Sequence, residues 1–89
     1  MSMINTMPEG QERALSEIAA EISSDWTRPY FGAVPYLTAM AELSAVTEDY
    51  YAESAADIVR RFLSNAQTWR GGTARRVKAE LNAMIKERY

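Results

Sequence analysis

The sequence predicts an all-α protein, a small bundle of about four helices. Apolar residues recur at intervals of three and four in four segments, and no segment alternates apolar and polar residues as a half-buried strand does. The connections between these segments are short, and 89 residues suffice for one domain. We therefore expect a single helical domain over residues 1–89, with a short flexible N-terminus at about residues 1–6.

The first helix is predicted from about Pro8 to Ser24. Thr6 at its cap and Glu9 three residues later can each satisfy a free backbone N–H group at the helix start. One apolar stripe then faces the core. It consists of Leu15, Ile18, Ala19, Ile22 and Trp26.

The second helix is predicted from about Ala33 to Val46, with Pro35 tolerated in its first turn. Apolar side chains cover nearly its whole circumference, and a helix of that kind is normally surrounded. We expect its outward face to contact a partner; the alternative is that exposed alanines form much of that face. Its polar residues are Thr38, Glu42 and Ser44.

The third helix, about Ala52 to Thr68, has the clearest amphipathic pattern in the chain. Asp57 precedes Arg61 by four residues, a spacing that favours an ion pair. The predicted inward residues are Ala55, Ile58, Val59, Phe62, Leu63 and Ala66.

The fourth helix is predicted from Gly72 or Thr73 to Arg88, after a Gly71-Gly72 break. Its predicted inward residues are Ala74, Val77, Leu81, Met84 and Ile85.

The composition argues against catalysis. The chain has no cysteine and no histidine, which excludes disulfides, the usual Cys/His zinc sites, thiol nucleophiles and the commonest general base. No calcium-binding loop, phosphate-binding loop or nucleophile elbow occurs. We expect a non-enzymatic protein without cofactor or metal. No apolar stretch approaches the roughly 20 residues of a membrane helix, and no secretory signal is visible, so we expect a cytoplasmic protein that does not enter membranes.

Residues 25–36, DWTRPYFGAVPY, combine four aromatic residues with two prolines. Such a stretch can form a recognition loop, because Trp, Tyr and Arg dominate interface hot spots, or it can close the end of a small core. We favour the core for Trp26 and Phe31. With the second helix, the stretch supplies the predicted partner-binding residues, which are Arg28, Tyr30, Tyr36, Met40 and Leu43.

Charge is divided along the chain. Residues 1–57 have a net charge of −8 and residues 58–89 a net charge of +6, consistent with −2 overall. Basic residues on the last two helices could contact phosphates, which makes a small nucleic-acid-binding regulator the alternative function. The competing interpretation pairs the acidic first helix with the basic last one. The nucleic-acid candidates are Arg60, Arg61, Arg70, Arg75, Lys78 and Lys86.

Residues 68–76, TWRGGTARR, allow two interpretations. A Gly-Gly pair before a helix leaves open N–H groups that can hold an anion, with Arg70, Arg75 and Arg76 nearby. We favour the simpler one, in which Trp69 packs as a hinge and the glycines permit the turn. The connection AQTWRGG is longer than the three or four residues of a helix-turn-helix, which weighs against that DNA-binding motif.

The stretches YFGAVPYLTAM and IVRRFLSNAQTWRGGTARRVKAELNAM resemble small uncharacterised helical proteins encoded by actinobacterial phages and prophages. The resemblance covers roughly residues 26–85. It implies a cytoplasmic accessory protein that acts by binding, and it brings no activity, cofactor or catalytic residue. We therefore predict a protein-binding module that forms a homodimer or engages a host factor.

Overall fold

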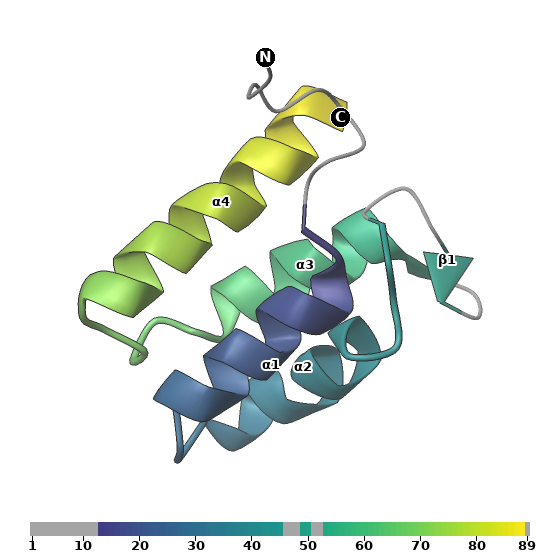
Figure 1. Ribbon diagram of the computed structural model, residues 1–89. Coiled ribbons are helices and arrows are strands. Elements are labelled where there is room, and N and C mark those ends of the chain that lie inside the picture. The colour runs from purple at the N-terminus through teal and green to yellow at the C-terminus, as the bar shows by residue number, and fades with distance from the viewer. Residues whose placement is uncertain (1–12, 46–48, 51–52, 89) are drawn as a thin grey trace.

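The computed structural model describes residues 13–45, 49–50 and 53–88. Over these residues it confirms the predicted all-α bundle (Figure 1). Each helix packs mainly against two others, in the closed order α1, α2, α3, α4. The helices are α1 (Leu15–Asp25), α2 (Val34–Met40), α3 (Ala55–Ser64) and α4 (Gly72–Arg88), with a 3-10 turn, η1 (Phe31–Ala33), before α2.

A short antiparallel pair, β1 (Asp49–Tyr50) and β2 (Glu53–Ser54), precedes α3. Asp49 is opposite Ser54 and Tyr50 is opposite Glu53. No strand was predicted from the sequence, because two-residue strands are too short to show an alternating pattern. The pair leads directly into α3, whose first turn is capped because the Ser54 hydroxyl accepts a hydrogen bond from the Asp57 N–H at 3.1 Å.

The predicted apolar stripes of α1, α3 and α4 form the core. The stripe of α1 is buried throughout, and in α3 and α4 only Leu63 and Ile85 remain partly exposed at its edge. The bounds of α4 are as predicted, whereas α3 is shorter than predicted at both ends. Periodicity therefore identifies the inward faces correctly.

α1 begins at Leu15 and not at Pro8, because Ala14 has an extended backbone with φ −62° and ψ 143°. The proposed cap residues Thr6 and Glu9 lie outside the described residues. The observed cap is tertiary: the N–H groups of Leu15 and Ser16 donate to the carbonyls of Ser44 and Leu43 at 3.0 and 2.8 Å. Local sequence cannot reveal such a cap, because its acceptors come from the segment after α2.

α2 ends at Met40, so its predicted extension to Val46 is wrong. The chain tightens there into turns, with the N–H of Glu42 donating to Ala39 and that of Leu43 donating to Met40, at 3.0 and 3.1 Å. α2 also has an ordinary solvent face, since Val34, Pro35, Thr38 and Ala41 are exposed. The prediction that this helix is surrounded on all sides is therefore wrong.

Three aromatic rings join α1, α3 and the segment before α4. Trp26 stacks on Trp69 with ring centroids 5.8 Å apart and an interplanar angle of 13°. Phe62 meets both indoles edge-on, at 6.3 and 6.4 Å. The buried Trp69 indole N–H donates to the Asp25 carboxylate at 2.8 Å, so its polar atom is satisfied. Trp69 thus packs as the predicted hinge.

Ion pairs connect α1 with α4. The Arg13 guanidinium binds the Glu80 carboxylate with contacts at 2.6 and 3.0 Å, and also lies 2.9 Å from a Glu21 oxygen. Arg76 binds the same Glu21. Hydrogen bonds from Arg76 and Arg13 hold the pKa of Glu21 below its usual value. The charge complementarity predicted between the first and last helices is present at Glu21 and Arg76.

The turn before α4 generates a test with two adjacent glycines. Gly71 has φ 114°, so Gly71→Ala should strain the backbone and destabilise the fold by about 1–2 kcal/mol. Gly72 is the first residue of α4, and Gly72→Ala should stabilise by up to about 1 kcal/mol. Neither new methyl group meets an atom within 4 Å. Urea unfolding measures both; equal effects of the two variants would contradict this description of the turn.

The Glu21 ion pairs predict a pH-dependent contribution to stability. Because the folded state lowers the pKa of Glu21, the stabilisation is present at neutral pH and is lost as pH falls through that pKa, below about 4.3. Glu21→Gln should therefore be less stable than the wild type at pH 7 and approach it at pH 3 in urea unfolding. Glu42→Gln is the control, because Glu42 is exposed and forms no ion pair with a described residue. A pH-independent Glu21→Gln deficit would refute the prediction.

Candidate functional site

The aromatic stretch divides into an inward and an outward part. Trp26 is 9% exposed and belongs to the core, as predicted. Phe31 is 79% exposed, so its predicted core position is wrong. Tyr30 and Val34 are 46% and 41% exposed. Together with the exposed Arg28 they form a surface that we call the aromatic ridge, consisting of Arg28, Tyr30, Phe31 and Val34.

Local geometry fixes the ridge. The Ala33 N–H donates to the Tyr30 carbonyl at 2.8 Å, which closes the turn that carries Phe31. The rings of Tyr30 and Phe31 lie 4.9 Å apart with a tilt of 56°. A Cβ atom on Gly32 would lie 2.6 Å from Tyr30 Cε2 and 2.9 Å from Asn65 Oδ1. Gly32 is thus the residue that allows Tyr30 to pack over the turn and against the end of α3.

A hollow of about 310 Å³ lies beside Tyr30. Its other lining residues carry uncharged groups that can donate or accept hydrogen bonds. They are Ser64, Asn65, Gln67 and Thr68. The ridge and the hollow together offer a projecting ring next to a polar recess.

The remaining predicted partner-binding residues are less accessible. Tyr36 is half-buried against the core and interacts with Arg61, and this hydrogen bond raises the pKa of Arg61. Met40 is 0% exposed and Leu43 is 4% exposed, so both are core residues and not contact residues. Met40 lies on the inward stripe of α2, and Leu43 lies in the turn that follows the helix. The ridge retains Arg28 and Tyr30 from the prediction.

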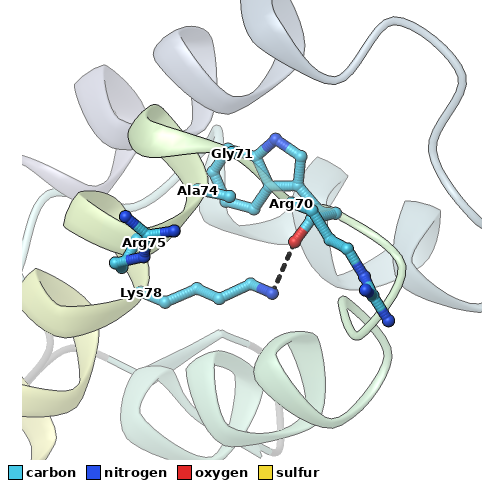
Figure 2. Close-up of a pocket in the computed structure, with 6 residues that line it drawn as sticks. Arg70, Gly71, Ala74, Arg75 and Lys78 are labelled. Carbon is cyan, nitrogen blue, oxygen red and sulfur yellow. Dashed lines mark hydrogen bonds between the residues drawn. The ribbon is translucent and has the colours of Figure 1, made fainter.

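A second cavity, of about 280 Å³, lies at the corner where the chain enters α4 (Figure 2). We call it the corner cavity. Lys78 Nζ donates to the Trp69 carbonyl at 2.7 Å and lies 5.8 Å from the Trp69 ring centroid. Burial and the charge of Arg70 lower the pKa of Lys78. The lining residues are Trp69, Arg70, Gly71, Ala74, Arg75 and Lys78.

A third hollow continues the basic surface between α3 and α4. It is lined by Arg60, Asn82, Ile85 and Lys86. The structure therefore places five of the six nucleic-acid candidates around two cavities, with Arg60 and Lys86 at this one. Arg61 lies elsewhere, beside Tyr36. Within α3, Asp57 pairs with Arg60 at 2.7 Å, so the predicted pair with Arg61 is corrected.

Comparison of the chain with models of protein families, with curated proteins and with solved structures finds no match. Over the described residues, no group of three or more Asp, Glu, His or Cys side chains is placed to hold a metal ion. None of the helices described is both long and apolar enough to cross a membrane.

Sequence reasoning missed Phe31 and Val34 as surface residues. A usable signal existed, because Ala33, Leu37 and Met40 follow the i, i+4, i+7 spacing of one inward stripe. That stripe places Val34 on a different face from Met40. No comparable periodicity applies to Phe31, whose exposure depends on the turn around Gly32.

The close approach at Gly32 generates a test of the ridge geometry. Gly32→Ala should displace the Tyr30 ring and destabilise the fold by about 0.5–1.5 kcal/mol, the range for side chains forced from their rotamers. In a Tyr30→Ala background the same substitution should cost less, because the nearest clash is gone. Urea unfolding of the four proteins gives the coupling energy. Equal costs in both backgrounds would show that Tyr30 does not pack on Gly32.

Proposed function

We propose that this protein is a non-enzymatic protein-binding module that engages its partner through the aromatic ridge. The observation that carries the proposal is Phe31, which is 79% exposed although it sits on a turn fixed by hydrogen bonding and packing. Fully burying a Phe side chain contributes on the order of 1.5–3 kcal/mol. A partner that covers Phe31 therefore gains a contact of hot-spot size.

The rigidity of the ridge favours binding as well. Ordering a free side chain or loop on association costs binding energy, and a preformed surface avoids much of that cost. The hydrogen-bonded η1 turn fixes the backbone that carries Phe31, and the Tyr30 ring packs over Gly32. The ridge thus has the features of a preorganised anchor.

The shape and chemistry of the ridge and the adjacent hollow indicate which features a partner needs. A projecting ring requires an apolar recess, which Phe31 and Val34 would fill. The hollow beside Tyr30 requires hydrogen-bonding groups at the rim of that recess. We favour a different protein over a second copy, because the ridge projects and the polar groups around the adjacent hollow would lose hydrogen bonds to water against a phenyl ring. The resemblance to phage-encoded proteins adds a host-encoded partner in the cytoplasm to the proposal.

The test uses Phe31→Glu with Ala83→Glu as a matched control, since Ala83 is exposed on α4 and the added charge is the same. Tagged wild type and variants are used for pull-down from nuclease-treated host lysate, read by mass spectrometry. A protein retained by wild type and Ala83→Glu should decrease at least about tenfold with Phe31→Glu, which corresponds to about 1.4 kcal/mol or more.

Circular dichroism melting verifies that both variants fold. Sedimentation over a concentration series detects self-association; a dimer weakened by Phe31→Glu would identify the partner as a second copy of this chain. Equal retention of the same protein by folded Phe31→Glu would refute the ridge as the binding surface.

A further inference from the structure

The corner cavity gathers three basic side chains from two segments. Arg70 comes from the loop before α4, and Arg75 and Lys78 come from its first two turns (Figure 2). Among the described residues that line the cavity, none is acidic. Trp69 and Ala74 are buried and form its apolar floor. The cavity therefore has the charge and the shape of an anion site.

Arg70 and Arg75 differ from three other basic residues of the described chain. Arg13, Arg60 and Arg76 each bind a carboxylate. Arg70 and Arg75 form no ion pair with a described carboxylate, and both are exposed. Their charges thus remain available to a ligand.

Lys78 adds hydrogen-bond donors to the corner cavity. Its amine has three N–H donors, and one of them is donated to the Trp69 carbonyl. Burial lowers the pKa of Lys78, and the nearby positive charge of Arg70 lowers it further by repulsion. An anion between them would offset this repulsion and accept the remaining donors.

The basic surface continues beyond the cavity. Arg75, Lys78, Asn82 and Lys86 follow the spacing of one helical stripe on α4. Arg75 and Lys86 are eleven positions apart, which corresponds to about 16 Å along the helix axis. A row of that length exceeds the size of a single phosphate and suits a ligand with several regularly spaced phosphates.

We propose that this row and the neighbouring Arg70 bind the backbone of a nucleic acid, with one phosphate in the corner cavity. We call these five residues the phosphate strip (Arg70, Arg75, Lys78, Asn82 and Lys86). The strip carries no exposed aromatic ring on which a base could stack, and phosphate contacts carry no sequence information. Binding is therefore sequence-independent. This role is separate from the aromatic ridge.

The experiment measures fluorescence anisotropy of labelled 20-nucleotide single-stranded and duplex DNA, in two unrelated sequences, between about 50 and 200 mM salt. The test variant is Arg70→Gln/Arg75→Gln. Its charge-matched control is Arg28→Gln/Arg61→Gln, because both residues are exposed and lie outside the strip. Circular dichroism verifies that both variants fold.

At the lowest salt we expect the test variant to bind at least about tenfold more weakly, and the slope of log affinity against log salt to fall by about 1.4 to 1.8 for two lost contacts. The control should lose less than the test variant, and the two sequences should bind alike. Phe31→Glu should bind DNA as the wild type does, which separates this proposal from the protein-binding one. Two results would overturn it: no binding of either DNA, or equal losses in the test and control variants.

Discussion

The packing of Trp26, Phe62 and Trp69 is the interaction on which the rest of the molecule depends. It joins the end of α1, the last turn of α3 and the segment before α4. The aromatic ridge begins two residues after Trp26, and the corner cavity has Trp69 in its floor. Both candidate surfaces are therefore outward continuations of one buried cluster. The Trp69–Asp25 hydrogen bond adds direction to this packing, because it fixes how the indole lies between the segments.

Some charged side chains form ion pairs between helices, and others are exposed on the surface. The Glu21 and Glu80 carboxylates bind Arg13 and Arg76, which holds α1 against α4. α4 presents Arg76 and Glu80 toward α1, and it presents most of the phosphate strip on another face. One helix thus serves both packing and the proposed binding. A net charge of −2 thus conceals a strongly basic local surface. The overall charge does not reveal it, whereas the division of charge along the chain does.

The sequence was most informative where structure depends on local periodicity. The inward faces of α1, α3 and α4 follow from the 3.6-residue repeat, which can be recognised in each helix without knowledge of its neighbours. The start of α4 follows from the Gly71-Gly72 break. The start of α1 and the end of α2 could not be predicted, because Leu43 and Ser44 supply the carbonyls that cap α1. The basic side chains of the two cavities were largely predicted, because α4 alone places most of them. The accessibility of Phe31 was not predicted, since it depends on the close contact among Gly32, Tyr30 and Asn65.

The two surfaces meet at the segment between α3 and α4. Thr68 lines the hollow beside the aromatic ridge, and the next residue, Trp69, lines the corner cavity. They differ in chemistry, because the first combines an exposed ring with uncharged polar groups and the second is basic. This short connection combines core packing with surface contact. Trp69 is buried in the core, while Thr68 and Arg70 on either side of it are exposed. The length of this connection, which argued against a helix-turn-helix, is what allows consecutive residues to serve two different surfaces.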